Sequence, residues 1–98
     1  MDTAHRLVAL FKKDETHVRT SGRAVPTMLR VLQALYERPL LNLKEASRRS
    51  GLSFPAASKG ITGLVDLGIA REFTGKRPNR VFAYDQYLAV LSEGTEPL

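Results

Sequence analysis

The residues with the clearest potential for chemistry begin with a short stretch of small hydroxyl side chains and one cation. Ser53, Ser58 and Lys59 lie within seven positions of one another. Short side chains at the start of a helix let its first turn approach base edges and phosphates closely, and Lys59 would lie with the two serines at the groove. Backbone N–H groups at the same helix end would add partial positive charge. This stretch therefore favours contact with a major groove.

A second stretch places three cations around a predicted turn. Lys76, Arg77 and Arg80 surround Pro78 and Asn79. Cations that point away from a hairpin suit contact with phosphates or with a minor groove. A charged hairpin tip is also often only a solvated loop, or a deterrent to strand pairing. Both interpretations remain open.

Three further residues also have alternative interpretations. Arg48 and Arg49 close a short predicted helix, where they either contact DNA or only complement the helix dipole. Phe54 either packs the start of the next helix onto the core or faces DNA.

The elements that must position these residues read as a helix-turn-helix followed by a β-hairpin. Helices are expected over 44–50 and 54–67, with Ser47 small enough for a close crossing and Gly51 suited to positive φ at the turn. Ser53 is placed to cap the second helix, and Leu52 to face the core. The hairpin strands are expected over 69–73 and 80–84, around a turn at 74–79.

Other segments complete the predicted core. Helices are expected over 3–20 and 25–38, with a short third strand beside the wing over 40–43 and a last helix from 85. Asn42 is expected to cap the helix that follows the short strand. The apolar stripe of the first helix is thin, because Asp14 interrupts it. One explanation is that this helix packs against a partner outside the chain. Gly60 and Gly63 either weaken their helix or permit a close backbone contact, and Gly63 is expected to face outward.

These elements predict an α+β, mostly α fold of the winged helix-turn-helix type. The expected organisation is an N-terminal linking helix over 1–22, a winged helix-turn-helix domain over 23–92 and a C-terminal tail over 93–98. A chain of 98 residues is long enough for one hydrophobic core.

The charge is concentrated where the helix-turn-helix and wing are expected. The net charge is +5, and residues 39–80 carry eight Lys and Arg against three acids, whereas residues 81–98 carry no Lys or Arg and three acids. This distribution favours an anionic partner. Since the elements match a DNA-binding fold, double-stranded DNA is the expected partner.

Composition also argues against several classes of function. The absence of cysteine excludes disulfides and thiolate metal sites. His5 and His17 have no partner at metal-ligand spacing, and no catalytic triad, carboxylate pair or phosphate loop is evident, so we expect neither an enzyme nor a cofactor. No apolar run could span a bilayer and no signal peptide is evident, so a cytoplasmic protein with no membrane partner is expected.

Several phrases of the chain resemble the C-terminal winged-helix extension of bacterial Fic-family proteins. They are Leu52-Ser53-Phe54-Pro55, Gly68-Ile69-Ala70-Arg71-Glu72, Thr74-Gly75-Lys76-Arg77, and Arg80-Val81-Phe82-Ala83-Tyr84-Asp85-Gln86-Tyr87-Leu88. The resemblance implies a regulatory module of a longer protein. Fic proteins transfer AMP or related groups onto protein hydroxyls, through a His-Pro-Phe and Gly-Asn-Gly-Arg motif that this chain lacks.

The sequence thus supports two functional hypotheses. The first is a double-stranded DNA-binding module that regulates transcription, acting as a homodimer on two half-sites. The second is a protein-interaction or dimerisation module that docks or restrains the Fic catalytic domain without binding DNA.

Overall fold

Helices dominate the structure, with a small sheet at one side. The computed structural model describes residues 2–73 and 80–94. Within these ranges the elements are α1 (Thr3–Arg19), α2 (Val25–Glu37), β1 (Leu40–Asn42), α3 (Leu43–Ser50), α4 (Phe54–Asp66), β2 (Arg71–Glu72), β3 (Val81–Ala83) and α5 (Asp85–Gly94). Every predicted helix and strand is therefore present, although the hairpin strands are shorter than expected and α5 extends two residues into the expected tail.

The sheet joins the wing to the segment before the helix-turn-helix. Its strand order is β1-β3-β2, and both pairings are antiparallel. Phe82 of β3 lies opposite Leu41 on one side and Glu72 on the other. The expected third strand beside the wing is thus confirmed, as is the α+β winged helix-turn-helix fold. The predicted turn at 74–79 lies outside the described residues.

The turn between α3 and α4 has the predicted chemistry. Gly51 adopts φ 73° and its N–H donates to the Ser47 carbonyl oxygen at 3.0 Å. Such a left-handed conformation is accessible to glycine at little steric cost. Ser53 caps α4 by accepting a hydrogen bond from the Ala56 N–H at 3.3 Å. Asn42 caps α3 in the same way through the Glu45 N–H, at 2.8 Å.

Ser47 has a role in the turn beyond the small size that the sequence suggests. Its hydroxyl donates to the carbonyl oxygen of Leu52 at 2.7 Å, which ties the end of α3 to the turn. The small residue that α3 buries is the preceding Ala46, which is 1% exposed. Ser47 therefore stabilises the turn by a hydrogen bond, in addition to being small.

Two glycines let α4 approach α2 very closely. A Cβ atom on Gly60 would lie 2.8 Å from Cγ2 of Val31, and one on Gly63 would lie 2.5 Å from Sδ of Met28. The predicted close backbone contact is thus confirmed. The expectation that Gly63 faces outward is wrong, because Gly63 lies one helical turn after Gly60 and is buried on the same side.

Helix α1 finds its packing partners within the chain. Its Asp14 is only 4% exposed and accepts a hydrogen bond from the Tyr84 hydroxyl. Phe11 stacks on Tyr36 of α2 with ring centroids 3.9 Å apart, and Val18 lies in the central core. Asp14 therefore joins the packed face of α1 instead of interrupting it, and no outside partner is needed to cover that face.

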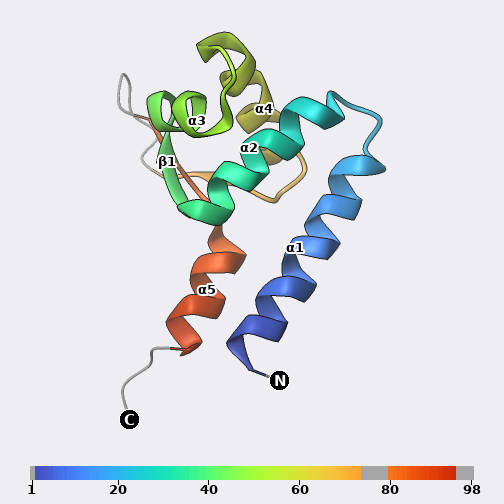
Figure 1. Cartoon of the computed structure of the whole chain (residues 1–98), viewed down its shortest axis with the longest axis vertical. Coiled ribbons are helices and arrows are strands. Elements are labelled where there is room, and N and C mark those ends of the chain that lie inside the picture. Colours follow the sequence, from blue (N-terminus) through green and yellow to red (C-terminus); the bar gives the residue numbers. More distant parts are fainter. Residues whose placement is uncertain (1, 74–79, 95–98) are drawn as a thin grey trace.

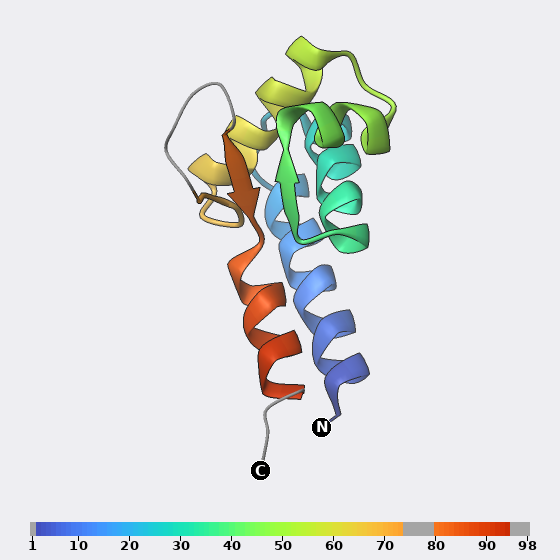
Figure 2. The ribbon, with the colours of Figure 1, turned by 90° about the vertical axis from the view of Figure 1, so that its left-hand side faces the viewer.

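The two ends of the molecule differ in construction. Helices α1 and α5 lie side by side and form one end, with the first turn of α1 near the last turn of α5 (Figures 1 and 2). The Arg6 guanidinium donates to the Glu93 carboxylate across this pair at 2.9 Å. The α3–α4 turn lies at the opposite end (Figure 2).

The α2–α4 contact predicts an unusual response to alanine. Alanine is favoured over glycine by about 1 kcal/mol in a helix interior, but a methyl group on Gly60 would press against Val31 and the backbone of Thr27. Because overpacking typically costs about 1–3 kcal/mol, Gly60→Ala should lower the free energy of unfolding, measured in urea. Gly63→Ala should lower it less, since the unbranched Met28 side chain can repack. A higher urea midpoint for Gly60→Ala would contradict the close contact.

The Asp14–Tyr84 pair predicts a specific alkaline instability. Burial, together with the hydrogen bond to Asp14, raises the pKa of Tyr84 above its usual value of 10.0. In the unfolded chain this phenol ionises near 10, so its contribution to stability is complete below that pH and is lost as the pH rises. Tyr84→Phe should cost about 1–3 kcal/mol at neutral pH by leaving Asp14 without its donor.

Urea unfolding from neutral to alkaline pH tests this assignment. The loss of stability above pH 10 should be shallower in Tyr84→Phe than in the parent chain. Tyr87→Phe is the matched control, because the Tyr87 hydroxyl donates only to a backbone carbonyl oxygen, that of Tyr36. An alkaline slope unchanged by Tyr84→Phe would sink the interpretation.

Candidate nucleic-acid interface

The outer face of α4 is a narrow stripe of short side chains around one lysine. Ala57, Ile61 and Leu64 are buried on the inner face. Four exposed residues follow one another at helical spacing on the other side, and they are Pro55, Lys59, Thr62 and Asp66. Phe54, the first residue of α4, is also exposed. Ser58 is half-buried at the edge of this stripe. The structure therefore places Ser53 at the cap of α4, with Ser58 and Lys59 in the second turn of that helix.

The backbone at the start of α4 offers fewer donors than expected. Pro55 has no N–H, the Ala56 N–H is taken by the Ser53 hydroxyl, and the Ala57 N–H donates to the Ser53 carbonyl oxygen at 2.8 Å. Within the described part of the chain, only Phe54 among these first residues keeps an N–H without a partner. Contact with an anion at this end therefore depends on side chains.

Arg48 and Arg49 are engaged by acids of the domain itself. Glu45 accepts from Arg48 at 2.7 Å and from Arg49 at 3.2 Å, and Arg49 also pairs with Glu37 at 3.1 Å. The hydrogen bond from Arg48, supported by Arg49, lowers the pKa of Glu45 to about 2. Both arginines were predicted as DNA contacts, and the structure places them in an ion-pair cluster on the outer side of α3.

The wing arginine that the structure describes is also paired. Two nitrogens of Arg80 donate to the Glu72 carboxylate at 3.0 and 2.8 Å, and its guanidinium lies 5.3 Å from the centre of the Phe82 ring. The two contacts hold this side chain on the sheet, so its charge is balanced locally. Lys76 and Arg77, the other predicted wing contacts, lie outside the described residues.

Six cations in the described ranges have no ion pair: Lys12, Lys13, Arg30, Arg38, Lys44 and Lys59. Arg30 of α2 lies at the α3–α4 turn, where its Nη1 donates to the Ser50 carbonyl oxygen at 3.4 Å and lies 3.7 Å from the position of a Cβ on Gly51. The sequence prediction missed Arg30. No local signal marks it, because tertiary folding brings it to a turn twenty residues later in the chain.

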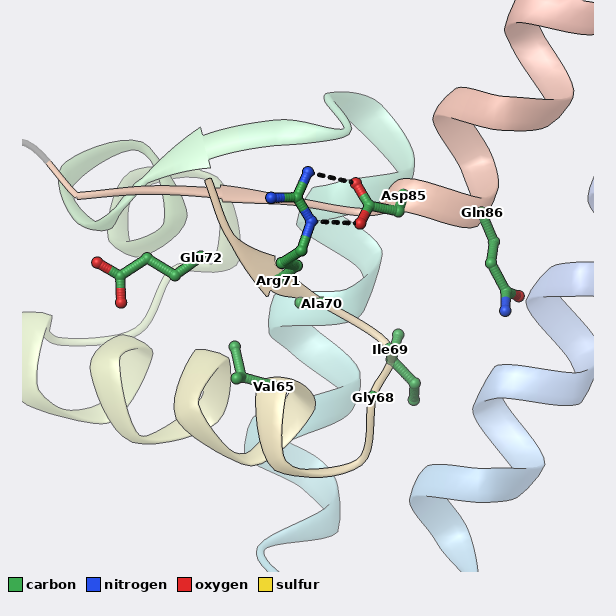
Figure 3. A pocket seen from close by; sticks show the side chains of 8 residues that line it. All are labelled: Val65, Gly68, Ile69, Ala70, Arg71, Glu72, Asp85 and Gln86. Atoms are coloured by element: carbon green, nitrogen blue, oxygen red, sulfur yellow. Dashed lines mark hydrogen bonds and ion pairs between the residues drawn. The ribbon is translucent and has the colours of Figure 1, made fainter. Parts of the chain in front are cut away.

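A pocket of about 480 Å³ lies away from this surface, between the end of α4, β2 and the start of α5. Arg71 and Asp85 both line it and point directly toward each other, while Glu72 points away from them (Figure 3). Arg71 donates twice to Asp85, at 2.5 and 3.1 Å. Because this pairing neutralises the guanidinium, the pocket presents no free cation to an anionic ligand.

Comparison with known proteins found no match among family models, curated proteins or solved structures. Across residues 2–73 and 80–94, none of the helices has the length and apolar character needed to cross a membrane. The same ranges hold no group of three His, Asp or Glu side chains placed to bind a metal ion. The α4 surface, flanked by Arg30, is the candidate site that the geometry supports best.

Proposed function

We propose that this chain is a double-stranded DNA-binding module, with α4 in the major groove and the β2–β3 hairpin beside the adjacent backbone. The observation that carries this proposal is the stripe of short side chains on α4, the second helix of the helix-turn-helix. In this fold class the second helix is the one that enters the groove. Beyond Phe54 at the helix start, the exposed face carries short side chains that permit that approach, and Lys59 supplies a cation within it.

Charge supports the same assignment. Lys59 and Arg30 lie on either side of the exposed start of α4, and neither forms an ion pair in the described part of the chain. Lys76 and Arg77 would add two cations at the wing on sequence grounds. Arg48 is 65% exposed, so it can exchange Glu45 for a phosphate, whereas Arg49 is only 25% exposed and is paired twice. We therefore rank Arg48 above Arg49 as a contact.

The resemblance to Fic-family extensions supports a regulatory setting. On that basis we propose a C-terminal regulatory domain of a cytoplasmic Fic-type protein, acting in transcriptional regulation. The adenylyltransferase chemistry would belong to a separate catalytic domain. Because a single small module makes few contacts, a homodimer on two half-sites would raise affinity.

A docking function is the second candidate. Val8 on α1 is 56% exposed and Phe73 after β2 is 57% exposed, and neither belongs to α4. Exposed apolar side chains of this size are suited to contact with another protein, including a Fic catalytic domain or a second copy. Such binding depends weakly on salt, which separates it from DNA binding.

Fluorescence anisotropy with labelled random duplexes tests the first candidate. Affinity should fall steeply between about 50 and 200 mM salt, with a slope of about −0.9 for each phosphate neutralised. Lys59→Ala and Arg30→Gln should each reduce the magnitude of that slope by about 1. Glutamine removes the charge and is too short to keep the 3.4 Å hydrogen bond to the Ser50 carbonyl oxygen, so the melting temperature of this variant is measured beside its affinity.

Lys12→Ala and Lys13→Ala are matched controls, because each removes one exposed, unpaired cation from α1. They should leave the salt slope unchanged. Equal losses in the α1 and α4 variants would contradict a DNA face on α4. Absence of duplex binding at 50 mM salt would overturn the proposed function and favour docking.

A further inference from the structure

Phe54 is an exposed aromatic residue at the leading end of α4. Its exposure is 53%, and it belongs neither to the core nor to the apolar residues packed against the core. Phe54 is therefore not a buried anchor of the helix start, and about half of its surface is available to a partner. Burying the exposed phenyl ring of Phe54 against a ligand would be favourable, because apolar surface would be removed from water. In a helix-turn-helix, the residues at the start of the second helix are the ones that contact base edges.

The phenyl ring of Phe54 carries no hydrogen-bonding group. Pro55 follows it without an N–H, the Ala56 N–H is taken by the Ser53 cap, and Ala56 itself is half-buried. A base edge that presents donors or acceptors to the ring would lose hydrogen bonds to water without replacement. The major groove carries one apolar group that suits it, the C5-methyl of thymine.

We propose that Phe54 contacts the thymine C5-methyl group and thereby determines part of the sequence preference of the domain. This inference rests on the proposed DNA-binding function. DNA is favoured over an apolar protein surface by charge complementarity, since Arg30 lies at the adjoining turn and Lys59 lies about 7.5 Å further along the helix axis. These unpaired cations would hold the phosphates on either side while the ring reaches the base.

The experiment begins with selection of preferred duplexes from a randomised pool. Each thymine of the selected site is then replaced by deoxyuridine, which removes only the methyl group, and binding is measured by anisotropy. At one position in the half-site, the replacement should weaken binding about fourfold, as expected for one buried methyl-sized group. Phe54→Ala should bind the thymine and uracil duplexes equally, with an unchanged melting temperature.

Phe73→Ala is the matched control, because it truncates an equally exposed phenylalanine outside the helix-turn-helix. A wing contact in the minor groove does not meet the thymine methyl, so this variant should retain the fourfold preference. Binding that is insensitive to uracil at every position, or a preference retained in Phe54→Ala, would overturn the inference while leaving DNA binding intact. Binding without any sequence preference would overturn it too. Failure to bind any duplex would overturn the proposed function itself.

Discussion

The close crossing of α4 over α2 is the constraint on which the rest of the structure depends. Gly60 and Gly63 bring the two helices so near that a methyl group at either position would meet Val31 or Met28. Since both glycines face α2, the helical period turns Lys59 and Thr62 toward solvent. The contact that builds the centre of the core therefore also determines which face of α4 is available to a partner.

A buried hydrogen bond between Tyr84 and Asp14 connects the remaining elements to this core. Tyr84 directly follows β3, its N–H donates to the Pro39 carbonyl oxygen at 2.8 Å, and its hydroxyl reaches Asp14 of α1. One residue thus links the wing, the end of α2 and the first helix. A buried carboxylate is costly unless it is hydrogen-bonded, so this arrangement favours a single placement of α1 beside α5.

The sequence predicts local features well because their causes are local. Gly51 at the turn, Ser53 and Asn42 at the helix starts, and the order of elements all follow from conformational preference and capping. Features set by tertiary packing were misassigned or missed. The sequence pattern places Gly63 outward because glycine has no side chain to give an apolar signal. The same pattern makes Asp14 an interruption of the apolar stripe, because nothing in the nearby sequence indicates that the Tyr84 hydroxyl is its partner.

The candidate site shows the same division. Lys59 is exposed on α4 and Ser53 caps that helix, as the sequence predicts, whereas Ser58 is half-buried. The ion pairs of Arg49 with Glu37 and of Arg80 with Glu72 depend on how neighbouring elements pack or pair, whereas that of Arg48 lies within α3. Glu45 is three residues before Arg48, and this spacing already permits a helical ion pair. The pairing of Arg49 with Glu37 on another helix, like the position of Arg30, appears only after folding.

In the proposed complex, the start of α4 and the adjoining turn form the DNA-binding face. An NMR titration of the ¹⁵N-labelled chain with a short duplex at low salt locates this face residue by residue. Amide shift changes should concentrate between Gly51 and Thr62 and around Arg30, while the outer turns of α1 and α5 remain unchanged. Shift changes centred on Val8 and the α1–α5 pair, with α4 unaffected, would rule out a DNA-binding face on α4.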